Sequence, residues 1–318
     1  MKKSKIILML IMAFGLTKTV YGAGGTIKMY YTYYNDVEDG NNRIQKTIGG
    51  KTTYVDLIKI AGDQEYIGYC VDVGANLATQ EPVQTVGDLA TYLNTTLNNA
   101  SKSQSLAKKI NEYIYFGYGY SNHKSQNYYA ATQKLIWEEL YKNGYRQNYY
   151  EENVPFSYGS TYIALNDEEN SIKASITAYY QKPSLCSSSS KLELAKGETK
   201  SYTDTNGVLA NYKVTCSSGL TCTTNGNELK ITANQASSGQ KVSFTKGGSE
   251  TYPVVYRNGT DQGVAVSTGS IGPVSCEFGV DSYENVQTSG SIAIVVISIG
   301  LIAAIMSYAI YITKKESV

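Results

Sequence analysis

The segment 128–141, with the sequence YYAATQKLIWEELY, has the periodicity of an amphipathic helix. Gln133, Ile136, Trp137 and Leu140 are spaced at i, i+3, i+4 and i+7, so they share one face of that helix. Three apolar side chains with a glutamine at their head indicate a buried face that includes one primary amide. A buried amide is costly unless it is hydrogen-bonded, so Gln133 needs a partner from another element.

The earlier stretch Tyr66–Val73 is rich in aromatic and β-branched residues, which predicts a strand. Side chains alternate along a strand, so Tyr69 is expected to face the core of the sheet. Cys70 then projects from the opposite face, where a helical layer covers it. Gly68, two positions earlier, leaves room on that face for the helix to come close.

Cys70 stands alone in the first half of the chain, whereas the other four cysteines cluster after residue 183. A free thiol on an oxidising surface is a liability unless it is buried or chemically committed. Four clustered cysteines in an exported protein indicate two disulfides, and three pairings are possible. A bridge between Cys216 and Cys222 would close a short turn and leave Cys186 to pair with Cys276.

Composition excludes several classes of protein. The net charge is +1 with no block of like charges, so no nucleic-acid partner and no anionic-lipid partner is expected. A single histidine, His123, excludes a histidine-based metal site, and we expect neither a metal nor another cofactor.

The two ends of the chain predict export and membrane anchoring. Residues 1–22 combine a lysine-rich start, an apolar run and a small residue at the cleavage point, which is typical of a signal peptide. A transmembrane helix needs about 20 residues to cross the hydrocarbon layer, and the uncharged run 292–312 is long enough to form one. Two lysines follow it, so residues 313–318 are expected in the cytoplasm and residues from 23 onward outside the cell.

The segment Asn285–Gly290, NVQTSG, resembles the sortase signal Asn-Pro-Gln-Thr-Gly of Gram-positive surface proteins. It departs from that pattern by a valine in place of proline and by a serine before the glycine. Sortase-mediated attachment to the cell wall and a stable membrane anchor therefore both stay open.

The exported part is expected to form two domains, because a serine-rich break follows Pro183. Residues 23–183 mix strand and helix patterns, which indicates an α+β domain. Residues 184–262 contain short strand candidates separated by turn dipeptides, which predicts an all-β immunoglobulin-like sandwich. Residues 263–291 have the composition of a stalk. The individual predictions are strands at 26–34, 51–61, 66–73, 191–194, 211–215, 228–232, 240–245 and 251–256, and helices at 86–97, 103–115, 128–141 and 168–180.

Two short motifs resemble bacterial thioester domains, the reactive modules of Gram-positive surface adhesins. These domains pair an aromatic-Cys-aliphatic-Asp/Asn stretch with a later Thr-Gln-x-x-aliphatic-Trp stretch. Here the two stretches are 69–72, YCVD, and 132–137, TQKLIW. The resemblance covers roughly residues 25–184 and implies a sheet or barrel subdomain with a helical subdomain. The segment 204–209, DTNGVL, resembles the opening of the β-domain that often follows.

The resemblance implies an internal thioester between Cys70 and Gln133. The cysteine thiolate attacks the glutamine carboxamide, ammonia leaves, and the product is an acyl donor with a good leaving group. An amine on a host or surface protein, such as a lysine side chain, takes the acyl group and frees Cys70. The bond is used once, so the protein is a reactant and not a turnover enzyme. Supporting roles are expected for five residues, as shielding walls or as hydrogen-bonding groups around the bond: Tyr69, Asp72, Tyr129, Thr132 and Trp137.

Three other interpretations stay open. Cys70 and Gln133 can be ordinary buried residues. Cys70 and His123 can form the nucleophile and base of a cysteine hydrolase or acyltransferase, although 121–124 has the pattern of a polar loop. The 30 tyrosines can instead serve a passive, non-covalent adhesin, because aromatic side chains suit binding surfaces. For the β-domain we expect the role of a spacer that holds the reactive domain away from the membrane.

Overall fold

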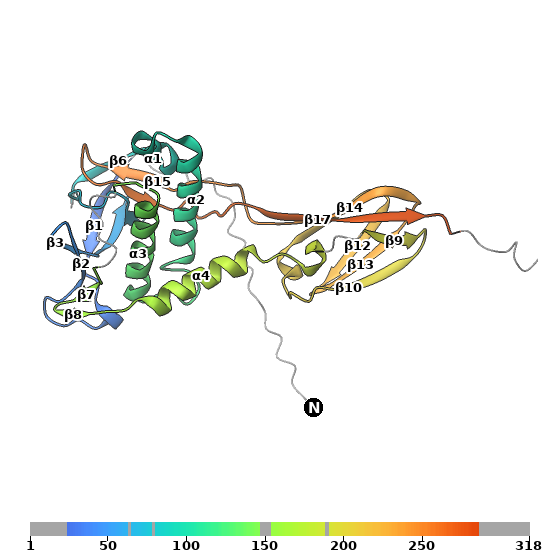
Figure 1. Ribbon diagram of the computed structural model, residues 1–318, viewed down its shortest axis with the longest axis horizontal. Helices are drawn as coiled ribbons and strands as arrows, with labels where there is room; N and C mark the ends of the chain where they lie inside the picture. The colour runs from blue at the N-terminus through green and yellow to red at the C-terminus, as the bar shows by residue number, and fades with distance from the viewer. Residues whose placement is uncertain (1–23, 63–64, 78–79, 147–153, 188–190, 286–318) are drawn as a thin grey trace, which may run out of the picture. The chain divides into compact units, whose positions relative to one another are not determined.

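The chain folds into two units in the computed structural model, which describes residues 24–62, 65–77, 80–146, 154–187 and 191–285 (Figure 1). The first unit contains the described residues up to Gln181 together with Gly247–Pro273. The second contains Lys182–Lys246 and the residues from Val274 onward. The chain therefore leaves the first unit, forms most of the second, returns to the first and leaves it again.

A closed barrel of antiparallel strands forms the centre of the first unit. Its order is β1-β4-β5-β16-β15-β6, so two strands that come late in the sequence close it. In particular, Val264 of β16 pairs with Cys70 at the end of β5. The strands are β1 (Gly24–Tyr30), β4 (Leu57–Ala61), β5 (Glu65–Cys70), β6 (Pro82–Asp88), β15 (Val254–Arg257) and β16 (Val264–Val266).

A second sheet of the first unit has the order β3-β2-β7-β8. Its strands are β2 (Ile44–Ile48), β3 (Lys51–Tyr54), β7 (Ser157–Tyr158) and β8 (Thr161–Tyr162). Gly49 and Gly50 join β2 to β3 with φ values of 57° and 73°. Positive φ at both central positions of a two-residue turn is the requirement of a type I′ hairpin, which glycine meets without strain.

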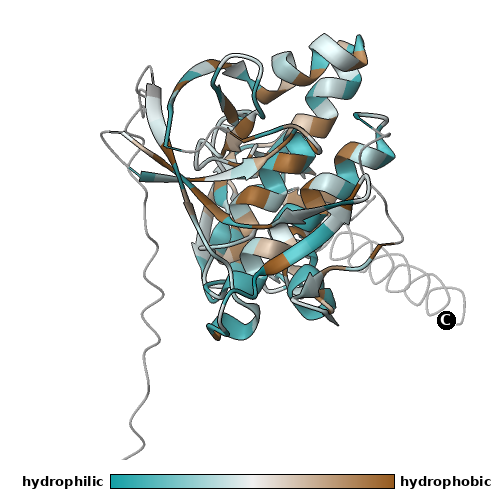
Figure 2. Ribbon diagram, turned by 90° about the vertical axis from the view of Figure 1, so that its left-hand side faces the viewer, coloured by the Kyte–Doolittle hydropathy of each residue, from teal (hydrophilic) through white to brown (hydrophobic). Residues whose placement is uncertain are grey.

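The described residues of the first unit also form four α-helices: α1 (Leu89–Leu97), α2 (Ala100–Phe116), α3 (Gln126–Lys142) and α4 (Asn166–Tyr180). Asp88 accepts a hydrogen bond from the Thr91 N–H and Asn99 accepts one from the Lys102 N–H, so both side chains cap the helices that follow them. Hydrophobic and hydrophilic residues alternate along the helices (Figure 2). Their apolar side chains join those of the barrel in one hydrophobic core.

The second unit has two sheets, β10-β13-β12 and β11-β14-β17-β9. The rings of Tyr202 and Phe278 are 6.4 Å apart and join one sheet to the other. A disulfide between Cys216 and Cys222 also links the two sheets. The strands are β9 (Leu192–Ala195), β10 (Thr199–Thr203), β11 (Lys213–Cys216), β12 (Leu220–Asn225), β13 (Glu228–Ala233), β14 (Ser237–Lys246) and β17 (Val274–Tyr283).

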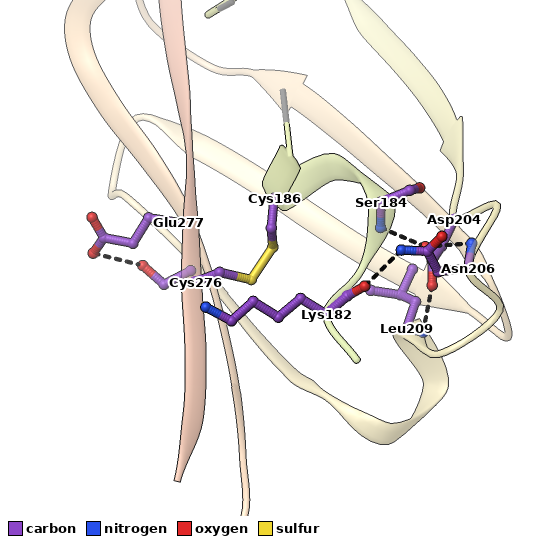
Figure 3. The surroundings of a disulfide bond; sticks show 9 residues. Lys182, Ser184, Cys186, Asp204, Asn206, Leu209, Cys276 and Glu277 are labelled. Carbon is purple, nitrogen blue, oxygen red and sulfur yellow. Dashed lines mark hydrogen bonds between the residues drawn. A yellow bond between two sulfur atoms is a disulfide. The ribbon is translucent and has the colours of Figure 1, made fainter. Parts of the chain in front are cut away.

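A second disulfide joins Cys186, in a short 3-10 helix, to Cys276 on β17 (Figure 3). Beside it, the Asp204 carboxylate accepts backbone hydrogen bonds from Ser184 at 2.7 Å and from Val208 and Leu209 at 2.7 and 2.8 Å. Burial alone would raise the pKa of Asp204, but these N–H donors outweigh it and hold the pKa below its usual value. The DTNGVL segment thus ties the start of the second unit together.

The structure corrects the predicted domain boundaries. The candidate strand 251–256, assigned to the sandwich, is β15 of the barrel in the first unit. The predicted stalk 263–291 is also wrong, because it contains β16 of the barrel and β17 of the second unit. Both strands pair with partners far away in the sequence, which local turn and composition signals do not reveal. The immunoglobulin-like classification stays a prediction.

Two secondary-structure predictions in the first unit are also wrong in detail. The expected helix 86–97 begins only at Leu89, because Asp88 ends β6 and caps the helix. The expected strand 51–61 is interrupted at Val55 and Asp56, where the chain passes from β3 in one sheet to β4 in the other.

No helix within the described residues is long and apolar enough to cross a membrane. The predicted signal peptide 1–22, transmembrane helix 292–312 and tail 313–318 lie outside the described residues, as does all of the sortase-like segment after Asn285.

Candidate functional site

Cys70 and Gln133 lie against each other, although 63 positions separate them in the sequence. Cys70 is the last residue of β5, and Gln133 lies in the middle of α3. The Cys70 N–H donates to the Gln133 Oε1 at 2.8 Å, and the Gln133 Nε2 donates to the Cys70 carbonyl at 2.9 Å. The partner that a buried glutamine amide requires is thus the backbone of Cys70. These two bonds fix the carboxamide beside that residue.

Both residues line a cavity of about 590 Å³ in the first unit. Strand β3, the 74–77 loop and α3 contribute to its walls, and Trp137 is among the lining residues. Tyr69 and Tyr129 were also expected as walls, but neither lines the cavity. The cavity gives a molecule from outside a route to Cys70 and Gln133.

Cys70 is buried, and its thiol is free of any disulfide. Burial raises its pKa well above the usual value, and the negative charges of Asp72 and Asp56 raise it further. The thiol is therefore protonated at neutral pH. A protonated thiol is a poor nucleophile, so the site needs a group that removes its proton.

The face assignment along β5 is reversed relative to the sequence prediction. The Tyr69 ring stacks on the ring of Tyr129 from α3, with centroids 4.8 Å apart, so Tyr69 faces the helices. A Cβ on Gly68 would come within 2.4 Å of Val264 Cγ1 and 3.3 Å of Ile58 Cγ2, so Gly68 faces the barrel strands. Periodicity gave the two faces correctly but not which of them the helices cover, because a closed barrel buries both.

Tyr129 links the two strands next to the site. Its hydroxyl donates to the Gly68 carbonyl of β5 at 2.9 Å and accepts from the Ile58 N–H of β4 at 3.1 Å. The side chain is fully buried. Tyr129 therefore fixes β4 against β5 and fixes α3 on both.

Asp72 does not act where it was expected. Its carboxylate accepts hydrogen bonds from the hydroxyls of Tyr92 and Tyr145 and from the Gly263 N–H, and it forms a salt bridge with Arg146 at 3.1 Å. None of these groups belongs to Cys70 or Gln133. The Asp of the YCVD stretch thus fastens the end of β5 to α1 and to the chain entering β16.

Thr132 and Trp137 are both buried on α3. The Thr132 hydroxyl donates to the Tyr128 carbonyl one turn earlier, and a Cβ on Gly117 would come within 2.2 Å of it. Thr132 therefore packs α3 closely against the end of α2, and this hydrogen bond does not reach Gln133. Trp137 lines the cavity, and its ring stacks on Phe156 at 6.3 Å.

His123 does not pair with Cys70. Its Nδ1 is 2.6 Å from the Phe116 carbonyl, its Nε2 is 2.9 Å from the Ser171 hydroxyl, and its ring stacks on Tyr128. Both nitrogens are thus engaged away from the cavity. The hydrolase interpretation loses the base that it requires.

Asp56 lines the cavity with Cys70 and Gln133, and the sequence analysis did not single it out. Its Oδ2 forms a salt bridge with Arg43 at 2.8 Å, and its Oδ1 has no hydrogen-bond partner among the described residues. Burial raises the pKa of Asp56 to about 6, and the positive charge of Arg43 opposes this shift only in part. The available signal was the single acidic residue in the strand pattern 51–61, flanked on both sides by apolar residues.

No group of three or more His, Cys, Asp or Glu side chains suitable for a metal ion occurs in the described part of the chain.

Comparisons with known proteins match this geometry to one family. Residues 67–191 match the family model of the thioester domain. The thioester domain of the Staphylococcus aureus TIE protein has a similar structure, with a TM-score of 0.53 and 22% identity over 83% of this chain and 100% of that chain. Weaker matches are the Bacillus anthracis TIE protein (TM-score 0.34, 12% identity, 81% of this chain and 48% of that chain) and the thioester domain of the Enterococcus faecium TIE86 protein (0.28, 17%, 82% and 94%). Among curated proteins no match is found.

The segment 67–191 matches the thioester-domain family, so the resemblance drawn from YCVD and TQKLIW is confirmed. The matched segment includes Cys70, Gln133 and the whole of α3, and it extends into the second unit. The structural similarity at 22% identity supports the fold of the domain.

Proposed function

We propose that Cys70 and Gln133 form an internal thioester, and that the protein uses it to attach covalently to an amine of a host or surface protein. The observation that carries this proposal is the pair of hydrogen bonds between the Gln133 carboxamide and the backbone of Cys70, inside a cavity that both residues line.

The geometry supports bond formation in a direct way. The Cys70 Sγ attacks the Gln133 Cδ, the carboxamide oxygen takes up negative charge, and ammonia leaves. The Cys70 N–H already donates to that oxygen at 2.8 Å, so it stabilises the developing oxyanion. The bond from Nε2 to the Cys70 carbonyl holds the amide plane in place while the sulfur approaches.

The same donor serves the attachment step. A neutral amine, such as a lysine side chain, enters the cavity and attacks the acyl carbon of residue 133. The carbonyl oxygen again receives the Cys70 N–H, the C–S bond breaks, and an amide joins residue 133 to the partner. Each molecule reacts once, because the amide product does not return to the thioester.

We further propose that the protein acts on the outer face of a cell membrane. The signal-peptide pattern of 1–22, the uncharged run 292–312 and the two disulfides of the second unit support an exported, anchored protein. The second unit serves as a spacer, and the target is an accessible lysine amine of another protein.

Intact mass spectrometry of the exported region tests the bond. The expected mass is lower by one ammonia than the mass calculated with both disulfides formed. Methylamine should then add its own mass, and the adduct should map to Gln133. The measurement is made without reducing agents, because added thiols attack thioesters.

The control is Cys70→Ala, which keeps both disulfides and the fold and should show neither the ammonia loss nor the adduct. Full mass in freshly purified wild-type protein, together with no reaction with methylamine, would exclude the thioester. An ammonia loss that persists in Cys70→Ala would place the reactive bond elsewhere.

A further inference from the structure

We propose that the Asp56 carboxylate carries the proton in both reactions at the Cys70–Gln133 pair. It takes the proton from the attacking nucleophile and returns it to the group that leaves. This inference rests on the proposed function and assigns the proton acceptor that the buried thiol requires.

Asp56 and Cys70 line the same cavity, next to the end of the pairing between β4 and β5. The two strands pair antiparallel as far as Ile58 opposite Gly68; Asp56 lies two residues before Ile58, and Cys70 lies two residues after Gly68. Beyond that pair, the Gln133 carboxamide takes the backbone N–H and carbonyl of Cys70. In addition to burial, the negative charge of Asp56 raises the pKa of the Cys70 thiol, so the carboxylate lies close enough to act on this thiol.

Only one of the two carboxylate oxygens of Asp56 is occupied. Arg43 holds Oδ2 at 2.8 Å, whereas Oδ1 is buried with no hydrogen-bond partner among the described residues. The side chain of Asp56 is only 5% exposed. Burying an acceptor without a donor costs stability, so such an atom is expected where function requires it. Arg43 fixes the carboxylate and leaves one oxygen available for a proton.

The position of Asp56 in the fold also gives it access to the nucleophile. It lies in the crossover between β3 and β4, where the chain passes between the two sheets of the first unit, and it lines the cavity with Cys70 and Gln133. An amine that enters the cavity meets both the acyl carbon and the Asp56 carboxylate.

In bond formation, the Asp56 carboxylate takes the S–H proton of Cys70 as Sγ attacks the Gln133 Cδ. The resulting carboxylic acid gives that proton to Nε2, which leaves as ammonia. In attachment, the carboxylate takes one N–H proton of the amine as its nitrogen attacks the acyl carbon. The acid gives this proton to Sγ as the C–S bond breaks. Each step leaves Asp56 as it began.

The pKa of about 6, raised by burial, suits these steps. A proton carrier works best with a pKa near the working pH, since it must both accept and release the proton. Positive charge around Asp56 comes from Arg43 on the approach to β2 and from Lys51 of β3 in the cavity wall. The other titratable groups near it are Cys70 of β5, Tyr129 of α3 and Tyr54 of β3, the last also in the cavity wall. Burial raises the pKa of Cys70 and of Tyr129, so both are neutral at this pH.

The test compares Asp56→Asn with wild type, using the full exported region. Asparagine keeps the size of the side chain and cannot accept the proton. We expect the thioester to form about 100-fold more slowly in the variant. The thioester that does form should react with methylamine more slowly by a similar factor. A factor of about 100 is the low end of the effect of removing a general base. The matched control is Asp39→Asn, an exposed aspartate of the same unit, which should leave both rates unchanged.

The pH profile and chemical rescue separate a proton carrier from a merely structural residue. The rate constant calculated for neutral methylamine should fall in wild type as the pH drops below about 6, because Asp56 becomes protonated, and should not fall in Asp56→Asn. In Asp56→Ala, added formate should restore both reactions, since it fits into the space left in the cavity. Trp137 fluorescence, which reports only the first unit, shows whether each variant is folded.

The outcomes are distinguishable. If wild type never loses ammonia, the thioester itself is absent and the proposed function fails. If wild type forms the bond and Asp56→Asn matches its two rates, the role of Asp56 is refuted and the thioester stands. If both Asp56 variants fail to form the bond and formate does not restore it, Asp56 has a structural role and this inference is overturned.

Discussion

Removing the Tyr129 hydroxyl offers a quantitative test of how the site is held together. Tyr129→Phe keeps the aromatic ring, and hence the stacking on Tyr69 at 4.8 Å. It removes two hydrogen bonds, one from the Ile58 N–H at 3.1 Å and one to the Gly68 carbonyl at 2.9 Å. The change therefore isolates the hydroxyl from the packing of the side chain.

The expected cost follows from the fully buried position of Tyr129. Phenylalanine leaves one backbone donor and one backbone acceptor without a partner, and each such group costs about 1–3 kcal/mol. Partial recovery through direct pairing of β4 with β5 lowers the sum, so we expect a loss of about 2–4 kcal/mol in the free energy of unfolding. For a domain of this size, that corresponds to a drop in Tm of roughly 5–10 °C.

The assay is urea unfolding followed by fluorescence of Trp137, the only tryptophan, which reports the first unit. Both proteins carry Cys70→Ala, so that a covalent bond between β5 and α3 does not change the measured stability. The control is Tyr162→Phe, because Tyr162 is 76% exposed and loss of its hydroxyl leaves no buried polar group without a partner. A loss below about 0.5 kcal/mol for Tyr129→Phe would refute the argument that this hydroxyl joins the two strands.

Three further predictions concern stability. The double variant Cys186→Ala/Cys276→Ala opens a loop of 90 residues and should destabilise the second unit by about 4–5 kcal/mol. Removal of the Cys216–Cys222 bridge, which closes a much shorter loop, should cost only about 2 kcal/mol. Calorimetry without reductant measures both losses. Asp204→Asn should cost about 2–4 kcal/mol through lost backbone hydrogen bonds, seen as faster hydrogen exchange at 204–209. Because the native pKa of Asp204 is lowered, its contribution to the free energy of unfolding is present above the unfolded pKa of about 3.9 and is lost as the pH falls through the native pKa. A stability difference between wild type and variant that does not change with pH would contradict this. Asp56→Asn should instead stabilise the first unit by about 2 kcal/mol at pH 7. Burial raises the native pKa of Asp56 to about 6, so the wild type loses stability as the pH rises from 4 to about 6. Equal stability of the wild type at pH 4 and at pH 7 would refute this prediction.

The Cys70–Gln133 pair could be predicted from sequence because its signals are local. The spacing of Gln133, Ile136 and Trp137 defines one helix face, and the alternation around Cys70 defines a strand. Neither pattern needs knowledge of the partner element. The resemblance of the two short motifs to thioester domains then connects them, and the structure places the Gln133 carboxamide against the backbone of Cys70.

The supporting residues could not be predicted in the same way, because their roles depend on contacts between distant segments. Asp72 binds Tyr92, Tyr145 and Gly263, which come from three separate segments. Its place beside Cys70 in the sequence suggested a role at the thioester, but its side chain reaches other groups. Asp56 was missed for the opposite reason, since 14 positions separate it from Cys70 and only the folded cavity brings the two residues together.

The barrel itself was predicted only in outline. Strands β15 and β16 are separated from the rest of the barrel by the whole main segment of the second unit, and nothing in their short patterns indicates the partner sheet. A fragment of residues 23–183, the predicted first domain, would lack both strands. Strand β5, with Cys70 at its end, would then keep β4 but lose β16, the neighbour on its other edge.

The return of the chain to the barrel determines how a pull from the C-terminal side travels through the molecule. From Tyr283 the covalent path runs back along β17 to Val274 and then directly into the segment that contains β16 of the barrel. Since β17 is already extended, it has little length to yield. The Cys186–Cys276 disulfide gives β17 a second covalent connection, to the segment that follows α4. The load would therefore divide between that segment and β16, the strand hydrogen-bonded to β5.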